Sequence, residues 1–334
     1  MSTELIVGDG AFATLAGEWD DLAARGMTDT PFQTLAYQRA WWTHLQPEAA
    51  TLLTIAARAA SGELAAIGCF FQRDGALHFN GCIEETDYLD LIGPAERAAW
   101  AWEQVLDCLE TVTDPAWTAL DLCNIPAGSP TRDALRSLAE GRGYTVREEQ
   151  IETCPTIVLP ATFDAYLESL DSKQRRELSR KLRRAEAAEL TTTAVGPEDD
   201  VDAAVERFLT LLQTSTFEKR DWLNEGRRAV FHEVARAAQA AGTLQLLFCG
   251  IDGRAAAALF NFDYHDRIWV YNSGLDPTAF AALSPGVVLT AAAIERAIGL
   301  GRAEFDFLRG DEEYKYRFGA VDRPIYRLTL QRRD

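Results

Sequence analysis

The pattern of apolar and polar residues predicts the same order of elements twice, once early and once late in the chain. Each copy begins with a strand of small and apolar residues, a tight turn and a second strand. The strand, turn and strand are expected at residues 62–71, 73–75 and 76–81 in the first copy, and at residues 253–262, 264–266 and 267–274 in the second.

A helix and a short strand follow each predicted hairpin. The helices run from Ala95 to about Val112 and from Ser284 to about Ile298, and the short strands are Leu120-Asp121-Leu122 and Phe305-Asp306-Phe307. Chance recurrence of a common arrangement is one explanation. Duplication is favoured, because 334 residues exceed the roughly 250–300 at which a single core stops growing. We therefore expect two domains, residues 1–150 and residues 151–334.

The rest of the chain alternates between helical and strand patterns. We expect further helices at 12–25, 34–45, 132–141, 162–170, 172–189, 201–219 and 224–241, and further strands at 5–7, 144–151, 156–159 and 243–251. Mixed, mostly antiparallel sheets flanked by helices indicate the α+β fold class.

The charge of the chain narrows its possible partners. Asp and Glu number 51 against 33 Lys and Arg, a formal net charge of −18. So acidic a chain is not expected to bind DNA or an anionic membrane through its general surface, although a local basic patch can still bind phosphates. The first residues lack a signal-peptide pattern, and no apolar run approaches the roughly 18–20 residues of a membrane span. We therefore expect a cytoplasmic protein without membrane insertion.

The cysteines and histidines argue against a metal centre. The six cysteines form no CxxC pair, which excludes zinc-ribbon and thioredoxin motifs, and the four histidines do not cluster. Because the cysteines lie among apolar residues, we expect all six to be reduced and buried. GxSxG, P-loop, HExxH and GxGxxG motifs are also missing from the sequence.

Three stretches carry candidate chemistry, and the first is the start of the second predicted helix. Ser284 is a good N-cap, Pro285 suits the first helical position, and Gly286 leaves the opening turn without a side chain. Free N–H groups at such a helix start can bind a phosphate or pyrophosphate. An ordinary capped helix is the alternative.

The second stretch is a basic run from Lys173 to Arg184, with seven cations and one acid in twelve residues. Leu178, Leu182 and Ala185 are spaced to form a buried stripe, so the cations cover the other faces of the helix. Their sign opposes that of the chain, which favours a phosphate-bearing ligand over a merely solvated face.

The third stretch spans residues 305–319. Asp306 lies in a predicted strand, Arg309 and Asp311 follow in a turn, and Lys315 lies among aromatic residues. Charges interleaved with aromatic residues after a strand end are typical of a cleft. A structural cluster of ion pairs is the alternative.

Together these stretches resemble the GNAT acyltransferases of the CelD-like branch, distant relatives of the FemABX peptidoglycan aminoacyltransferases. The likeness is carried, in the family's order, by Pro31–Thr34 with Trp41-Trp42, Lys173–Arg184, Tyr271–Gly274 through Leu283–Gly286, and Phe305–Asp311 through Tyr314–Gly319. It implies a bacterial acyltransferase built from two tandem GNAT-like domains, with the acyltransferase cleft in the second. Tyr314-Lys315 ahead of Phe318-Gly319 resembles the aromatic–lysine pair at the reacting centre of Fem-type enzymes.

The resemblance also implies how the donor binds. The pyrophosphate of acetyl-CoA or another acyl-CoA would bind at Ser284, Gly286 and Val287, with Asn272 and Ser273 completing the donor site. No metal is implied.

The mechanistic hypothesis is acyl transfer to an amine. Lys315 would stabilise the oxyanion that forms at the carbonyl, with Tyr314 beside it. Asp306 or Asp311 would accept the amine proton. We expect the ammonium of Lys315 and the bare turn at Gly286 to face one cavity.

The acceptor is expected to be an amine of a small molecule or a cell-envelope precursor. Positive groups would hold its carboxylate or phosphates, and two residues of the first domain would reach it. The residues assigned to the acceptor are Arg309, Lys173, Arg176, Arg180, Asp87 and Tyr88.

Two other functions stay open. One is a Fem-type ligase that depends on aminoacyl-tRNA, although a net charge of −18 makes tRNA an unfavourable partner unless the basic helix forms a landing site. The other is a non-catalytic pair of GNAT-like domains that serves as a scaffold in polysaccharide assembly. The sequence leaves the oligomeric state open.

Overall fold

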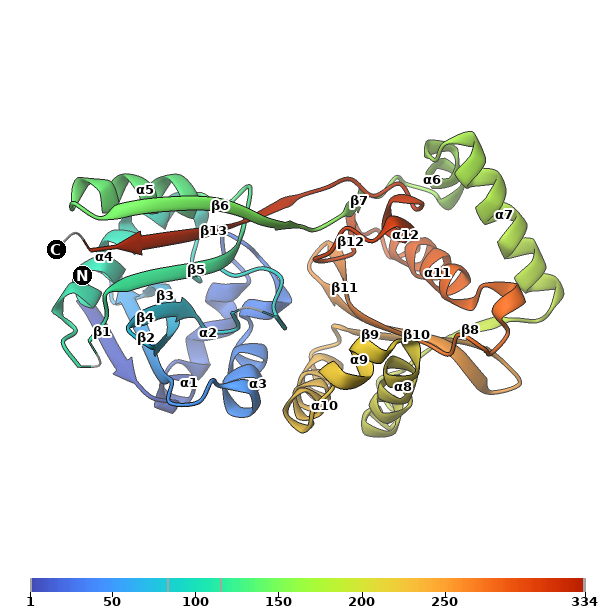
Figure 1. Ribbon diagram of the computed structural model, residues 1–334, viewed down its shortest axis with the longest axis horizontal. Coiled ribbons are helices and arrows are strands. Elements are labelled where there is room, and N and C mark those ends of the chain that lie inside the picture. Colours follow the sequence, from blue (N-terminus) through green and yellow to red (C-terminus); the bar gives the residue numbers. More distant parts are fainter. Residues whose placement is uncertain (1, 83, 115, 333–334) are drawn as a thin grey trace. The chain divides into compact units, whose positions relative to one another are not determined.

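The computed structural model describes residues 2–82, 84–114 and 116–332, and divides into two compact units (Figure 1). Unit 1 comprises Met1–Thr153 together with Arg323–Asp334, and unit 2 comprises Cys154–Asp322. The first boundary lies close to the expected one at residue 150. The end of the chain differs, because the last strand pairs within the sheet of unit 1 rather than that of unit 2.

Unit 1 contains a seven-stranded sheet and its helices. Its elements are β1 (Ser2–Val7), α1 (Gly10–Thr14), α2 (Ala16–Ala23), α3 (Leu35–Leu45), β2 (Thr51–Arg58), β3 (Leu64–Arg73), β4 (Ala76–Phe79), α4 (Ala98–Thr111), β5 (Ala119–Pro126), α5 (Thr131–Gly141), β6 (Thr145–Thr153) and β13 (Pro324–Gln331). The strand order is β1-β2-β3-β4-β5-β13-β6. β4 and β5 are parallel, and the other neighbours are antiparallel.

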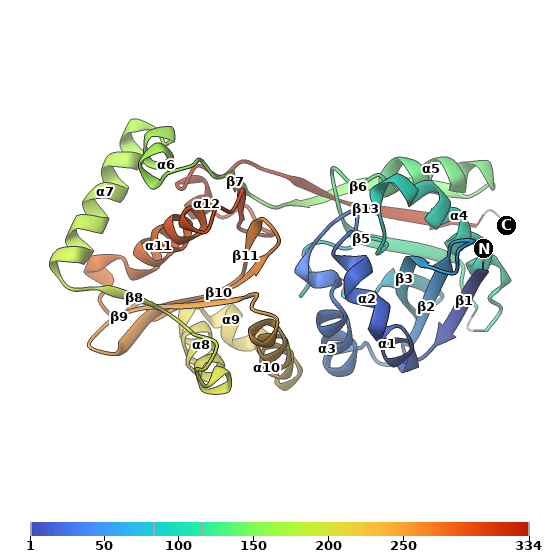
Figure 2. The same ribbon diagram turned by 180° about the vertical axis from the view of Figure 1, so that it is seen from behind.

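Helices cover both faces of this sheet, and for this reason β2 and β3 are buried along most of their length. On one face, Leu53 packs in a core with Trp102 of α4 and Leu135 of α5. On the other face, Trp41 of α3 stacks on Phe71 with 5.7 Å between ring centroids. Figure 2 shows α1, α2 and α3 grouped together beside the strands.

Unit 2 contains a six-stranded sheet. Its elements are β7 (Thr156–Val158), α6 (Phe163–Ser169), α7 (Ser172–Ala187), β8 (Thr191–Ala194), α8 (Val201–Ser215), α9 (Phe217–Trp222), α10 (Glu225–Ala240), β9 (Leu244–Ile251), β10 (Arg254–Tyr264), β11 (Arg267–Leu275), α11 (Pro285–Gly299), β12 (Glu304–Asp306) and α12 (Glu313–Tyr316). The strand order is β7-β12-β11-β10-β9-β8, with β11 and β12 parallel.

Two helical layers enclose the sheet of unit 2 (Figure 1). On one face, Leu178 of α7 and Ile294 of α11 share a core with Phe305 of β12. On the other face, the rings of Phe208 (α8), Phe231 (α10) and Phe260 (β10) lie 5.4–5.6 Å apart. Aromatic rings at these distances bury a large apolar area and gain edge-to-face attraction.

The predicted duplication is confirmed. β2, β3, β4, α4 and β5 of unit 1 correspond in order and pairing to β9, β10, β11, α11 and β12 of unit 2, including the single parallel pair in each sheet. The α+β class and the mostly antiparallel sheets are confirmed as well.

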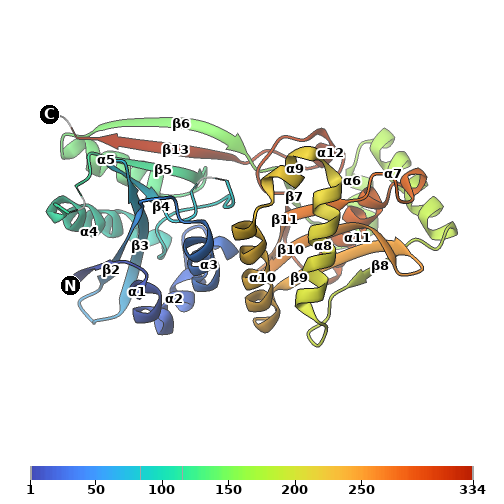
Figure 3. The same cartoon turned by 60° about the horizontal axis from the view of Figure 1, so that its bottom comes forward.

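Two predicted helices are each divided in the structure. The helix expected at 12–25 is α1 and α2, which meet at Leu15. The helix expected at 201–219 ends at Ser215, because Thr216 is extended and its hydroxyl accepts a hydrogen bond from the N–H of Lys219. This N-cap starts α9 in a new direction, and Figure 3 shows α9 at the end of α8.

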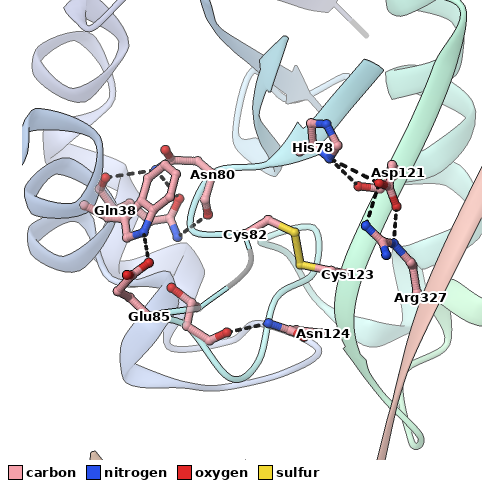
Figure 4. Close-up of a disulfide and its surroundings, with 11 residues drawn as sticks. Gln38, His78, Asn80, Cys82, Glu85, Asp121, Cys123, Asn124 and Arg327 are labelled. Carbon is pink, nitrogen blue, oxygen red and sulfur yellow. Dashed lines mark hydrogen bonds and ion pairs between the residues drawn. A yellow bond between two sulfur atoms is a disulfide. The ribbon is translucent and has the colours of Figure 1, made fainter. Parts of the chain in front are cut away.

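The cysteines correct one expectation, since Cys82 and Cys123 form a disulfide (Figure 4). Their Cα atoms lie 6.2 Å apart although the residues are 41 positions apart in the sequence. The parallel pairing of Leu77 with Leu120 carries both segments in the same direction and so brings the two sulfurs together. Cys69, Cys154 and Cys249 are buried thiols, and Cys108 is a half-buried thiol.

A polar cluster next to the disulfide joins three strands of unit 1 (Figure 4). His78 of β4 is half-buried, with its Nδ1 3.1 Å from the carbonyl oxygen of Asp121 in β5. Arg327 of β13 donates to Asp121 Oδ2 at 2.7 Å. The last strand of the chain is therefore held by a side-chain ion pair as well as by its backbone.

Within residues 2–82, 84–114 and 116–332, no helix is long and apolar enough to cross a membrane.

Candidate active site

A cavity of about 430 Å³ opens in unit 2 where two parallel strands separate. β11 pairs with β12 only from Arg267 to Trp269, opposite Glu304 to Asp306. Ser273, Gly274 and Leu275 in the remainder of β11 line the cavity, together with residues of β10, the start of α11, Tyr314 and Phe318. Most of this lining is apolar, as is usual for small-molecule sites.

The far end of β11 is fixed by its close contact with α8. A Cβ atom at Gly274 would lie 2.7 Å from the backbone nitrogen of Leu212, so only glycine permits this approach. The N–H of Leu275 donates to Ser215 Oγ at 2.6 Å. The end of α8, and with it the start of α9, therefore lies against the cavity-lining part of β11.

The start of α11 forms part of the cavity wall, as Ser284, Gly286 and Val287 all line it. Ser284 does not act as the expected N-cap: it is left-handed, with a φ of 56°, and its side chain makes no capping hydrogen bond. Its carbonyl oxygen instead accepts from the N–H groups of Val287 and Val288 at 3.0 and 3.1 Å.

The first turn of α11 is therefore a smaller anion site than the sequence suggested. Pro285 has no N–H, and Gly286 alone in this turn has an N–H for which the described residues show no backbone partner. The turn is nevertheless bare, because a Cβ at Gly286 would meet only Leu275 Cδ1, at 3.7 Å.

Lys315 corrects the central expectation, because it does not line the cavity. It is buried, and its Nζ donates to the carbonyl oxygens of Leu308, Arg309 and Gly310 at 3.0, 2.8 and 3.0 Å. The same Nζ lies 2.8 Å from Glu312 Oε2. With three protons and four acceptors, this ammonium is fully engaged in holding the turn at 308–310.

Asp306 supports the same turn. It is buried, and its Oδ1 accepts from the N–H of Leu308 at 2.7 Å. Leu308 and Gly310 have positive φ values of 58° and 109°. Asp306 and Lys315 therefore hold a strained turn from its two sides, and neither group has the position expected of a base or an oxyanion donor in the cavity.

The other predicted residues of this stretch are dispersed. Tyr314 lines the cavity, and burial together with the charge of Glu312 raises the pKa of its phenol. Asp311 is exposed, and Arg309 is half-buried with its carbonyl oxygen bound by Lys315. Neither Asp311 nor Arg309 lines the cavity.

The basic helix turns its predicted ligand residues away from the cavity. Lys173, Arg176 and Arg180 of α7 are exposed. The side of α7 that borders the site instead carries Gln174, Glu177, Leu178 and Lys181, which line a smaller cavity of about 60 Å³ together with Val287, Tyr314, Arg317 and Phe318. The predicted buried stripe is present, with Leu178 and Ala185 buried and Leu182 half-buried.

The two acceptor residues predicted in the first domain lie in unit 1. Tyr88 is buried and Asp87 is half-buried, in the loop between β4 and α4. Their role in acceptor binding stays a prediction.

Sequence reasoning missed Lys219, the best-placed basic group at the site. Its Nζ donates to the carbonyl oxygen of Ser273 at 2.6 Å, to Ser273 Oγ at 3.1 Å and to Asn272 Oδ1 at 3.3 Å. Burial lowers the pKa of Lys219 to about 8. In the sequence, Lys219 lies between Glu218 and Arg220 at the end of an expected helix and reads as a solvated residue. Only the break at Thr216 directs it toward β11.

In the described part of the chain, no group of three or more His, Cys, Asp or Glu side chains could hold a metal ion.

Most of unit 2 matches a known protein family. Residues 172–316 match the family model described as an acetyltransferase (GNAT) domain. No curated protein matches the sequence. The matched range contains Lys219, the strained turn and every residue that lines the cavity except Phe318.

Solved structures resemble the whole chain at low sequence identity. FemX superposes with a TM-score of 0.67 at 12% identity, covering 98% of this chain and 97% of FemX. The C-terminal domain of a putative lysylphosphatidylglycerol synthetase from Agrobacterium fabrum gives 0.61 at 12% identity, covering 96% and 93%. A tandem GNAT protein from the clavulanic acid biosynthesis pathway gives 0.52 at 12% identity, covering 98% of both chains.

Proposed function

Because the chain has a GNAT-superfamily fold with two GNAT-like domains, related to that of FemX, we propose that it is an N-acyltransferase. An acyl group is transferred from acetyl-CoA or a longer acyl-CoA, held in the cavity of unit 2, to an amine. The acceptor is a small molecule or an envelope precursor.

The observation that carries the proposal is the cavity at the separated strands. Beyond Trp269 the pairing of β11 with β12 ends, and the cavity of about 430 Å³ begins. A peptide-like pantetheine arm can bond to the free edge of β11, since an extended ligand can add to a strand edge as another strand does. The mostly apolar lining suits the acyl chain and the thioester.

The start of α11 supplies the polar end of the donor site. The N–H of Gly286 and the hydroxyl group of Ser284 lie at this wall of the cavity and can bind the donor's amides or phosphates. A single free N–H in the helix turn predicts modest affinity for the pyrophosphate.

Substitution of Gly286 by leucine tests the donor site directly. The space beside Gly286 admits a Cβ, and Gly286 lines the cavity, so we expect Gly286→Leu to fold and to place its side chain in the cavity. Gly299→Leu is the matched control, because it makes the same change in the same helix, where a Cβ meets nothing within 4 Å.

The assay is a thermal-shift titration with CoA, acetyl-CoA and octanoyl-CoA. A ligand at 100 times its Kd stabilises the folded state by about 2.7 kcal/mol. We expect wild type and Gly299→Leu to respond to at least one acyl-CoA, and Gly286→Leu to lose that response. If all three proteins respond equally, the donor binds elsewhere; if none responds to any CoA compound, the acyl-CoA proposal fails.

The likeness to FemX supports a second candidate, a ligase that depends on aminoacyl-tRNA. Three exposed cations of α7 can bind the phosphates of tRNA, namely Lys173, Arg176 and Arg180. Binding of aminoacyl-tRNA that weakens steeply with salt, combined with no response to acyl-CoA, would favour this candidate. No response to either donor class would favour a non-catalytic scaffold.

A further inference from the structure

Lys219 of α9 has an unusual set of partners for a half-buried lysine. Its Nζ contacts two carbonyl-type oxygens, Ser273 O and Asn272 Oδ1, and one hydroxyl, Ser273 Oγ. None of these three partners is charged. A lysine held only for structural reasons in such a place is usually paired with a carboxylate, since an enclosed charge without one is costly.

These three oxygens can form hydrogen bonds with the neutral amine of Lys219 as well as with its ammonium form. A neutral amine has two N–H donors, which match the two carbonyl-type oxygens, and one lone pair, which can accept the hydroxyl proton of Ser273. In the ammonium form, all three protons have an acceptor. The site can therefore gain and lose one proton without a change of partners.

The electrostatic surroundings of Lys219 bring its pKa close to physiological pH, so that the ammonium and the neutral amine are both populated. Burial lowers its pKa, and the nearby ammonium of Lys315 lowers it further, whereas the carboxylate of Glu312 raises it. Glu312 is itself engaged with Lys315 at 2.8 Å, so it offsets the burial of Lys219 only in part.

Ser273 connects this lysine to the cavity. Ser273 lines the cavity and its Oγ lies 3.1 Å from Lys219 Nζ, whereas Lys219 itself is not part of the lining. The close packing of Gly274 on α8 and the hydrogen bond from Leu275 to Ser215 fix this part of β11 against the end of α8. The hydroxyl thus has a stable position between the cavity and the amine.

We propose that Ser273 Oγ and Lys219 Nζ form a proton relay that deprotonates the acceptor amine during acyl transfer. The inference rests on the proposed function, and it replaces the carboxylates Asp306 and Asp311 as the proton acceptor. Ser273 contacts the reacting amine, and Lys219 acts through Ser273.

The neutral amine nitrogen forms a bond to the thioester carbonyl carbon, and the π pair of that carbonyl moves to its oxygen. One proton of the nitrogen moves to Ser273 Oγ, and the hydroxyl proton of Ser273 moves to Lys219 Nζ at the same time. The oxygen's pair then re-forms the carbonyl as the C–S bond breaks with its electron pair on sulfur. The ammonium of Lys219 returns a proton through Ser273 to the thiolate. The products are an amide and a free thiol, and the relay is restored.

The first experiment measures the titration of Lys219 without any substrate. The chain has only four lysines, Lys173, Lys181, Lys219 and Lys315, so lysine labelled with ¹³C at the ε position gives a spectrum that four variants can assign. We expect the signal that is lost in Lys219→Met to titrate near pH 8. Arg220→Met, which removes a neighbouring cation of the same helix, should leave it there. A Lys219 signal that titrates with the ordinary lysine value of about 10.4 overturns the relay.

The second experiment measures transfer from acetyl-CoA to glucosamine, spermidine or an alanyl peptide. For the pair that wild type uses, Ser273→Ala and Lys219→Met should each lower kcat about 10²–10⁴-fold, the range for general bases. Both should also remove the rise of kcat near pH 8, whereas Arg220→Met keeps it. Lys219→Cys treated with 2-bromoethylamine restores an amine of lower basicity, and should shift the rise to lower pH; wild type treated in the same way is the control.

The outcomes separate the relay from the proposed function. Transfer by Lys219→Met with an unaltered kcat and pH profile overturns the relay and leaves the N-acyltransferase standing. An acyl group found on Ser273 by mass spectrometry overturns the relay in favour of covalent catalysis. If wild type transfers from no donor to any amine, the proposed function fails and the relay with it.

Discussion

Lys315→Met is the sharpest test of the role that the structure gives to this lysine. The variant keeps most of the side-chain volume and removes the ammonium. Three backbone carbonyl oxygens, those of Leu308, Arg309 and Gly310, then lose their donor in a buried place, and Glu312 loses its ion pair. A buried charge pair that loses one partner typically costs 3–5 kcal/mol. Since Glu312 is 58% exposed, most of this cost comes from the carbonyl groups.

We therefore expect Lys315→Met to lower the free energy of unfolding of unit 2 by about 3–4 kcal/mol. Urea denaturation followed by hydrogen exchange of the peptide around residues 304–319 measures both the loss and its location. Lys181→Met is the matched control, because Lys181 forms its ion pair at 3.1 Å with Glu177, which is 42% exposed. That change should cost less than about 1 kcal/mol.

Glu312 adds a pH dependence to this test. Burial raises the pKa of Glu312, but the hydrogen bond and charge of Lys315 outweigh it and hold the pKa below its usual value. A depressed carboxylate pKa gives stability that is present above the unfolded pKa and is lost as the pH falls. Wild type should lose this contribution to its free energy of unfolding in acid, and Lys315→Met should not. If Lys315→Met has unchanged stability and a large loss of kcat, Lys315 takes part in the reaction and does not stabilise the turn.

Three further predictions concern the scaffold. Gly274→Ala should destabilise unit 2 by at least about 1–3 kcal/mol, because the new Cβ meets the backbone of Leu212 at 2.7 Å; a neutral result in urea denaturation would show that α8 can shift. Reduction of the Cys82–Cys123 disulfide should destabilise unit 1 by about 2–4 kcal/mol, measured as a lower Tm with dithiothreitol, and Cys82→Ser should abolish the effect of the reductant. Burial raises the pKa of Asp90 to about 6, so the folded state holds a proton between about pH 4 and 6 that the unfolded chain has released. The free energy of unfolding of unit 1 should therefore fall as the pH rises through this range. If chemical denaturation shows the same fall with pH for Asp90→Asn as for wild type, the assignment to Asp90 is wrong.

The sequence predicts the elements whose signals are local. The hairpins at β3–β4 and β10–β11, the helices α4 and α11, and the duplication all follow from turn residues and apolar periodicity within a few dozen positions. β13 was not predicted, because its place between β5 and β6 depends on partners nearly two hundred residues away.

The candidate site shows the same limit at the level of single side chains. Ser284 and Gly286 were predicted from a helix start that is visible in the sequence. Ser273 and Tyr314 were predicted through the family resemblance, and all four residues line the cavity. Lys315 was predicted as a cavity residue, but an aromatic–lysine pattern does not specify on which side of a four-residue helix each side chain lies. The partners of Lys219 depend on a helix break and on the packing of Gly274, neither of which has a local signature.

The position of β13 imposes an order on how the protein can be made. The central part of the sheet in unit 1 lacks a strand until residues 324–331 leave the ribosome, and Leu328 and Leu330 are part of its core. All 169 residues from Cys154 to Asp322 are synthesised before that strand, and they form one continuous segment. Unit 2 can therefore reach its native state during translation before β13 is made. The sheet of unit 1 stays open between β5 and β6 until residues 324–331 are in place, and its edges are exposed to chaperones, proteases and other nascent chains in the meantime.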